Sequence, residues 1–169
     1  MSRLLGIDLG ERRIGLAVAD GEIGIARPLA TIDRGRDLAA DVATLGRVCR
    51  EQGIDELVVG LPIEAHGAEG PMAAAARAWA GAVGEGLELA VAMRDERLSS
   101  FVAEQRLGRM PRGRSGGAPS RTQRNAFRAK IDREAAAVIL QDELDARRSA
   151  AATSAAPAAL IGSEHQEDR

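Results

Sequence analysis

The chain has 169 residues, of which 45% are hydrophobic and 28% are charged, and its formal net charge is −2. These values are typical of a globular protein of one domain and exclude a wholly unstructured chain. The single cysteine excludes an internal disulfide. Because no apolar segment approaches the roughly 18 residues of a membrane span or resembles a signal peptide, we expect a cytoplasmic protein without a membrane partner.

The first elements are predicted to be three strands in an antiparallel meander. Residues 4–20 read LLGIDLGERRIGLAVAD, two apolar runs joined by a short polar turn, which indicates a hairpin. Residues 26–32 are expected to form a third strand, which Pro28 places near an edge of the sheet. Asp8 interrupts the first apolar run, and a carboxylate there is costly to bury unless a cation or hydrogen-bond donors meet it. Asp8 is therefore a candidate functional residue, the alternative being a structural aspartate.

Helices and parallel strands are predicted to alternate after the meander. Helices are expected at residues 36–52, from Pro71 onward, from Ser99 or Ser100 to Gly108, and at residues 132–148; strands are expected at residues 56–61 and 87–93. This order predicts an α/β fold with a mixed five-stranded sheet, antiparallel at first and then parallel, and helices on both faces.

We expect one domain over residues 1–148, with a flexible basic loop at residues 111–125. Residues 149–169 are rich in Ala, Ser, Thr and Pro and end in EHQEDR. This composition predicts a disordered tail, because it cannot bury enough apolar surface to become ordered.

Three acidic residues lie in or beside apolar elements: Asp8, Glu96 after the last strand, and Asp132 at the start of the last predicted helix. If they converge, each pair of charges repels by about 4 kcal/mol at 4 Å and an effective dielectric of 20, so the cluster needs protons or cations. Mg²⁺ or Mn²⁺ prefer such oxygen ligands, and two ions can hydrolyse a phosphodiester. The spacing leaves alternatives open: Asp132 as a helix N-cap, and Glu96 in an ion pair with Arg97.

A strongly basic segment precedes Asp132. Residues 105–131 contain eight Lys and Arg residues and no acidic one. Because guanidinium groups bind phosphate through two oxygens at once, we expect this segment to contact a nucleic-acid backbone, the alternative being a solvated loop. The few aromatic residues favour recognition of shape over base stacking. The residues assigned to this contact are Arg112, Arg114, Arg121, Arg124, Arg128 and Lys130.

Three further residues have two interpretations each. His66 is expected to belong to a polar loop, the alternative being contact with phosphate or transfer of a proton. Arg12 and Arg13, in the hairpin turn near Asp8, are either solvated or in contact with a phosphate.

Four segments, in this order, resemble the YqgF (RuvX) family: GIDLGERRIGLAVAD, VVGLPIEAHGAEGP, DERLSS and KIDREAAAVILQ. They cover most of residues 4–145. Members of this bacterial family are described as pre-16S rRNA nucleases and as Holliday-junction resolvase-like proteins. The resemblance implies an RNase H-like fold and assigns the catalytic and metal-binding carboxylates to Asp8, Glu96 and Asp132, with Asp95 as a further candidate. His66 and the long, arginine-rich segment at residues 111–125 depart from the family pattern.

The main hypothesis is therefore a hydrolase of phosphodiester bonds, a nuclease of the two-metal-ion type using Mg²⁺ or Mn²⁺. The resemblance implies maturation of the 5′ end of pre-16S rRNA in ribosome biogenesis, with structured RNA or a pre-ribosomal particle as partner. Two alternatives are a resolvase of branched DNA and a non-enzymatic RNA- or ribosome-binding module. ATPases and sugar kinases of the actin-like group share the GxDxG pattern, but they need two such domains and this chain has room for one. We expect a monomer or a homodimer.

Overall fold

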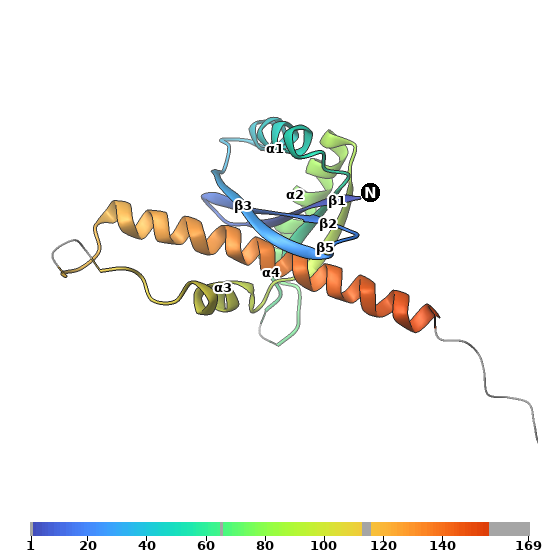
Figure 1. The fold of residues 1–169 in the computed structure, drawn as a ribbon. Helices are drawn as coiled ribbons and strands as arrows, with labels where there is room; N and C mark the ends of the chain where they lie inside the picture. Colours follow the sequence, from blue (N-terminus) through green and yellow to red (C-terminus); the bar gives the residue numbers. More distant parts are fainter. Residues whose placement is uncertain (1, 65, 113–115, 156–169) are drawn as a thin grey trace, which may run out of the picture.

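A five-stranded mixed sheet lies at the centre of the molecule, in the order β3-β2-β1-β4-β5 (Figure 1). The computed structural model describes residues 2–64, 66–112 and 116–155. β1 pairs antiparallel with β2 and parallel with β4, and β4 pairs parallel with β5. The predicted sheet is confirmed, with an antiparallel meander followed by parallel strands. The strands are β1 (Arg3–Leu9), β2 (Arg13–Asp20), β3 (Ile25–Asp33), β4 (Glu56–Leu61) and β5 (Ala90–Asp95).

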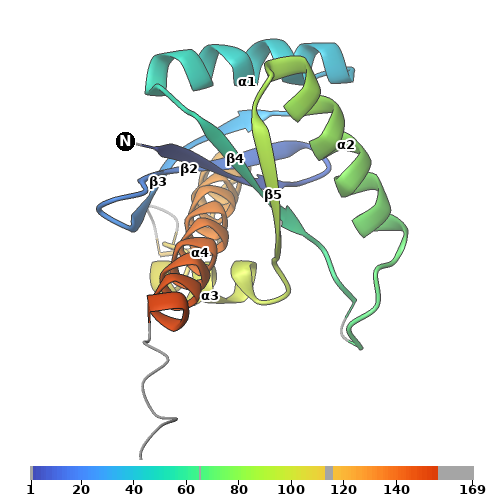
Figure 2. The same ribbon diagram turned by 90° about the vertical axis from the view of Figure 1, so that its right-hand side faces the viewer.

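Helices cover both faces of the sheet (Figure 2). Helices α1 (Leu38–Gln52) and α2 (Pro71–Leu87) lie on one face, and α4 (Arg121–Ala155) crosses the other with α3 (Ser99–Leu107) beside it. Because side chains of a strand alternate between the two faces, β1 serves both layers. Leu5 and Ile7 belong to the core under α1 and α2, whereas Leu4 belongs to the core under α4.

A buried aspartate ties α1 and α2 to the β1–β2 hairpin. Asp41 is 2% exposed and accepts hydrogen bonds from Trp79 Nε1 (2.9 Å), the Gly35 backbone N–H (2.7 Å) and Arg34 Nε (3.1 Å). Arg34 also donates to the carbonyl of Gly10 in the hairpin turn (3.1 Å). A buried charge is tolerated when donors surround it in this way, so this network fixes the turn that follows Asp8.

Small residues on the other face let α4 lie almost directly on the sheet. A Cβ atom built on Gly6 would lie 2.7 Å from Leu140 Cβ and 2.8 Å from the Ala136 carbonyl oxygen. A Cβ on Gly15 would lie 2.0 Å from the carbonyl oxygen of Asp132. These separations are shorter than van der Waals contact, so only glycine at these positions permits this helix–sheet distance.

Helix α4 is longer at both ends than the sequence predicted, and it corrects two expectations. It begins at Arg121, so residues 121–125 are helical rather than part of the basic loop. A capping box explains this start: Ser120 Oγ accepts from the Gln123 N–H (3.2 Å), and Gln123 Oε1 accepts from the Ser120 N–H (2.8 Å). The helix continues to Ala155, so residues 149–155 do not belong to a disordered tail, and residues 156–169 lie outside the described part.

The remaining boundaries agree closely with the sequence patterns. Gly53 ends α1 with φ 63°, Pro71 opens α2, and Pro28 lies in the edge strand β3 beside an irregularity in its pairing with β2. Strand β5 begins at Ala90 and not at residue 87 as predicted, because Leu87 is the last residue of α2. Within the described residues, no helix is long and apolar enough to cross a membrane.

Substitution of Gly6 by alanine tests the close contact between α4 and the sheet. The added methyl group must displace Leu140 or the helix backbone, so we expect Gly6→Ala to lower the free energy of unfolding by about 2 kcal/mol. Gly81 is an exposed residue of α2 with no atom within 4 Å of a built Cβ, and Gly81→Ala should instead stabilise the protein by about 0.5–1 kcal/mol. Urea denaturation of both variants measures the contrast. Equal effects would contradict this packing.

Candidate active site

The candidate site lies at the carboxyl ends of the parallel strands, on the face covered by α4. Leu4, Gly6 and Asp8 follow one another on this face of β1, because alternate residues of a strand point to the same side. Asp8 lies opposite Gly15 in the pairing of β1 with β2 and is partly buried. The alternation of side chains along β1 therefore directs Asp8, which interrupts the apolar run of this strand, to the face covered by α4.

Glu96 reaches the same place from β5. Its backbone N–H donates to the Leu61 carbonyl (3.2 Å), which fixes the chain just past the end of β5 beside the end of β4. Its Oε2 lies 2.0 Å from the position of a Cβ built on Gly60, so the absence of a side chain at Gly60 makes room for the carboxylate. Glu96 Oε2 is buried and has no hydrogen-bond partner among the described residues.

Asp132 enters the site from α4. It lies in the interior of this helix, so the N-cap alternative is wrong. Its backbone carbonyl lies over Gly15, the residue paired with Asp8. Its side chain accepts a hydrogen bond from Arg13 Nε at 2.5 Å. The three carboxylates therefore come from β1, the end of β5 and α4, and Arg13 neutralises the last of them.

The charges of these residues act on one another. Burial raises the pKa of Asp8 to about 7, and the negative charge of Asp132 adds to the shift. Burial also raises the pKa of Glu96 to about 7, with further contributions from the charges of Asp8 and Asp95. Among the described residues, no Lys or Arg side chain forms an ion pair with either carboxyl group. Asp8 and Glu96 are therefore two neighbouring acids that are each partly protonated near neutral pH.

The donor set of Asp8 and Glu96 fits a hard divalent cation. Both present carboxylate oxygens, and the buried Glu96 Oε2 lacks any donor in the described part of the chain. Within that same part, no three acidic, histidine or cysteine side chains are gathered closely enough to hold a metal ion. Asp132, the third ligand that the family resemblance implies, is bonded to Arg13 instead.

Two other predicted residues have partners of their own. Asp95 pairs with Arg97 at 2.7 Å, and this hydrogen-bonded contact lowers the pKa of Asp95. The alternative in which Arg97 pairs with Glu96 is therefore wrong. His66 is 70% exposed and lies 3.3 Å from Glu64 in the loop after β4. This contact fits the polar-loop interpretation of His66.

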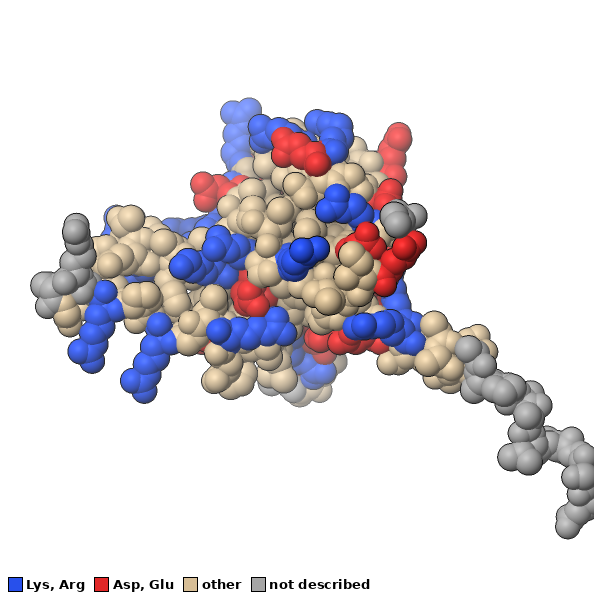
Figure 3. Space-filling model, viewed as in Figure 1, with Lys and Arg blue, Asp and Glu red and all other residues tan. Residues whose placement is uncertain are grey.

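The predicted nucleic-acid contacts lie mainly on the first turns of α4, which extend beyond the sheet (Figure 1). Figure 3 shows Lys and Arg side chains along this projecting end. Arg124, Arg128 and Asp132 recur every four residues and so follow one side of the helix toward the carboxylates. Lys130 is exposed on the same helix, Arg112 is exposed before it, and Arg114 lies outside the described residues.

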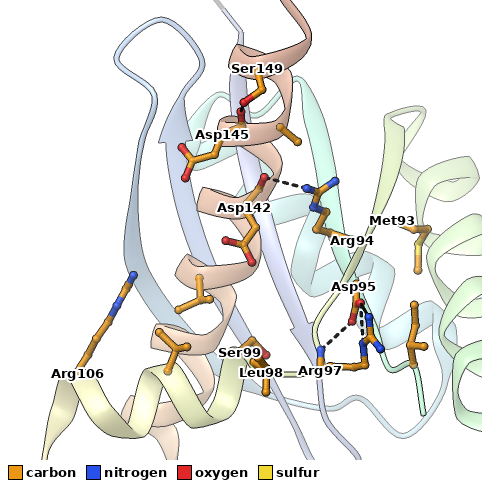
Figure 4. A pocket seen from close by; sticks show the side chains of 14 residues that line it. Met93, Arg94, Asp95, Arg97, Leu98, Ser99, Arg106, Asp142, Asp145 and Ser149 are labelled. Carbon is orange, nitrogen blue, oxygen red and sulfur yellow. Dashed lines mark hydrogen bonds and ion pairs between the residues drawn. The ribbon is translucent and has the colours of Figure 1, made fainter. Parts of the chain in front are cut away.

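A cleft of about 1060 Å³ adjoins the site between β5, α3 and the second half of α4 (Figure 4). Its three arginines are all matched by acidic groups: Arg94 by Glu143 (3.5 Å), Arg97 by Asp95 (2.7 Å) and Arg106 by Glu134 (3.0 Å). Asp8, Glu96 and Asp132 are not among the residues that line it. Because the cleft lacks the three carboxylates that the family resemblance assigns to catalysis, we place the candidate active site at those carboxylates and not in the cleft.

Comparison with known proteins decides the family. The model of the family described as "RuvX: Holliday junction resolvase" matches residues 2–146. The chain belongs to the RuvX family. The RNase H-like fold that the resemblance implies agrees with the strand order and the helices on both faces of the sheet.

Several relatives in the RuvX family are similar over nearly their whole length. Three of them, each named "Putative pre-16S rRNA nuclease", come from Anaeromyxobacter dehalogenans (46% identical; 86% of this chain, 98% of the relative), Chloroflexus aggregans (42%; 86% and 95%) and Thermosynechococcus vestitus (41%; 92% and 97%). Among solved structures, Thermus thermophilus RuvC in complex with a Holliday junction substrate is 17% identical with a TM-score of 0.49, covering 88% of this chain and 96% of that chain. The family and the names of the three relatives support a phosphodiester hydrolase.

The raised pKa of Asp8 predicts a pH-dependent stability. In the unfolded chain the carboxyl group ionises near pH 3.8, whereas in the folded protein it does so near pH 7, so the folded state loses stability as pH rises through this window. Asp8→Asn removes this loss. The unfolding free energy of Asp8→Asn should exceed that of the wild type at both pH values. We expect this difference, measured by urea denaturation without metal, to be about 2 kcal/mol larger near pH 8 than near pH 5. The exposed Glu11 is the control, and Glu11→Gln should show no such difference. An equal gain at both pH values would contradict the unusual environment of Asp8.

Proposed function

We propose that this protein is a metal-dependent endonuclease that processes the precursor of 16S rRNA at its 5′ end. The observation that carries the proposal is the pair of neighbouring carboxyl groups of Asp8 and Glu96, which have no counter-ion among the described residues, in a chain of the RuvX family. Such a pair is costly to keep for stability alone. It suits a site that gains its counter-charge from bound cations.

The acidic residues of the site would bind the cations. Mg²⁺ or Mn²⁺, as two ions, would be held by Asp8, Glu96 and Asp132 and would supply a water of lowered pKa and positive charge for the leaving oxygen. Asp8 and Glu96 would release their protons on binding a cation, since their pKa values of about 7 allow this near neutral pH. Gly60 leaves the space that the Glu96 carboxyl group occupies.

The first turns of α4 would hold the substrate backbone. Arg124 and Arg128 lie on the side of the helix that leads to Asp132, so phosphates bound there are guided toward the carboxylates. The scarcity of aromatic side chains favours recognition of a folded shape over base stacking. Structured RNA fits both features.

Branched DNA is the second candidate substrate, because the family is described by Holliday junction resolution and the same chemistry acts on DNA phosphodiesters. The names of the relatives favour ribosomal RNA precursor. Cleavage of a pre-16S RNA fragment and of a four-way DNA junction under one condition ranks the two. Preferred cleavage of the junction would overturn the proposed substrate and retain the chemistry.

Removing either member of the carboxylate pair should abolish cleavage. We expect Asp8→Asn and Glu96→Gln to lower the rate of pre-16S RNA cleavage with Mg²⁺ at least about a hundredfold, because the charge that holds the cation is lost. RNA binding should remain. Asp95→Asn is the matched control, since Asp95 adjoins Glu96 in sequence but pairs with Arg97, and it should retain most activity. Full activity of Asp8→Asn would refute a nuclease based on these residues, and RNA binding without cleavage by the wild type would favour the non-enzymatic binding module.

The basic turns of α4 should determine how binding depends on salt. We expect the triple variant Arg121→Ala, Arg124→Ala, Arg128→Ala to bind RNA more weakly and to lower the slope of log K against log salt by about 2, because each lost phosphate contact removes about 0.7–0.9. Filter binding over a salt series measures this slope. The control removes the same charge from the opposite side of the sheet, at the exposed Arg36, Arg47 and Arg50. Equal slopes for both triple variants would reject a specific contact.

A further inference from the structure

Arg13 contacts Asp132, the acidic residue that follows the basic first turns of α4. It is the first residue of β2 and lies two positions before Gly15, so both point to the face under α4. Its Nε donates to Asp132 Oδ2 at 2.5 Å, and the two side chains are 28% and 23% exposed. Arg128 lies one helical turn before Asp132. Arg13 therefore lies where the basic side of α4 meets the acidic site.

The backbone at Arg13 is fixed while its side chain can move. The Arg13 carbonyl accepts from the Gly10 N–H (2.9 Å), and the carbonyl of Arg12 accepts from the Arg34 N–H (2.9 Å). Arg34 in turn belongs to the buried Asp41 network. A guanidinium on a long side chain at a rigid turn can exchange one anion for another without moving the strand.

Two positive groups compete for Asp132 in this arrangement. The hydrogen bond from Arg13 occupies Oδ2 of Asp132, the residue that the family resemblance assigns as a further ligand of a cation held by Asp8 and Glu96. A divalent cation there would repel the guanidinium, because like charges a few ångströms apart in a partly buried site repel strongly. Arg13 then needs a new anion, and a substrate phosphate matches its two-pronged geometry.

We propose that Arg13 is a phosphate-positioning residue that Asp132 holds in place until the carboxylates take up a divalent cation. On cation binding the guanidinium leaves Asp132 and binds a phosphate of the substrate. Cation and nucleic acid thus strengthen each other's binding through Arg13, and this coupling is reciprocal. The inference rests on the proposed function for the identity of the site, and it adds the order in which cation and substrate bind.

The affinity for Mn²⁺ tests the competition in the protein alone. We expect Arg13→Gln to bind Mn²⁺ about fivefold more tightly than the wild type in isothermal titration calorimetry. In this variant Asp132 can bind the cation without first losing its hydrogen bond to the Arg13 guanidinium. The matched control is Arg12→Gln, which removes the same charge from the exposed neighbour. Its Mn²⁺ affinity should change less than twofold. In the background of Asp132→Asn, the additional change Arg13→Gln should tighten Mn²⁺ binding less than about twofold, because the shared partner is gone and only the repulsion between Arg13 and the cation is relieved.

The affinity for RNA tests the second half of the inference. Measured by stopped-flow anisotropy before cleavage, RNA binding by Arg13→Gln should match the wild type without metal and be about fivefold weaker with Mn²⁺. Arg12→Gln should change RNA affinity by the same factor in both conditions. Thermal unfolding confirms that each variant is folded.

The outcomes separate this inference from the proposed function. If Arg13→Gln binds Mn²⁺ no more tightly than Arg12→Gln, or binds RNA more weakly to the same degree with and without Mn²⁺, Arg13 is only a structural partner of Asp132 and the inference fails while the nuclease proposal stands. If the wild type takes up no Mn²⁺, both fail. If the Mn²⁺ and RNA affinities of Arg13→Gln change as expected but the wild type cleaves no RNA, the nuclease proposal is overturned and the role of Arg13 is supported.

Discussion

The site depends on one electrostatic constraint: the carboxyl groups of Asp8 and Glu96 share a partly buried space in which no described residue offers them a positive partner. Asp8 and Glu96 have pKa values near 7 for this reason, with burial as the main cause and neighbouring acidic charge as the second. A protein can keep such a pair only if the surrounding fold is stable enough to bear its destabilising effect. The two hydrophobic layers on either side of the sheet supply that stability.

The close packing of α4 on the sheet brings the constraint about. Because Gly6 and Gly15 have no side chain, the helix packs closely on β1 and β2, and Gly60 leaves the space that the Glu96 carboxylate fills. The same helix carries Asp132 at its point of closest approach and the arginines of its first turns beyond the sheet. A single rigid element thus joins the acidic site to the basic surface, so the distance between them is set by helical geometry and not by a loop.

Most of the fold follows from local patterns that are strong in this chain. The hairpin, the short apolar strand β4 and the helix opened by Pro71 have boundaries at or near their predicted positions because glycine, proline and side-chain periodicity act over a few residues. The start of α4 was predicted eleven residues too late, at residue 132 instead of Arg121. The signal that marks it, Ser120 followed three residues later by Gln123, is a capping box in the sequence.

The order of the amino acids shows which residues carry charge into apolar elements, and together with the family resemblance it identifies Asp8, Glu96 and Asp132. Their partners follow from the folded arrangement alone, since pairing depends on which strand lies beside which and on how close the helix comes. Arg97 pairs with Asp95, and no described residue donates to Glu96 Oε2, whereas Arg13, 119 residues away in sequence, neutralises Asp132. Coulomb energies depend on distances in space, and residues remote in sequence acquire those distances only when the chain folds.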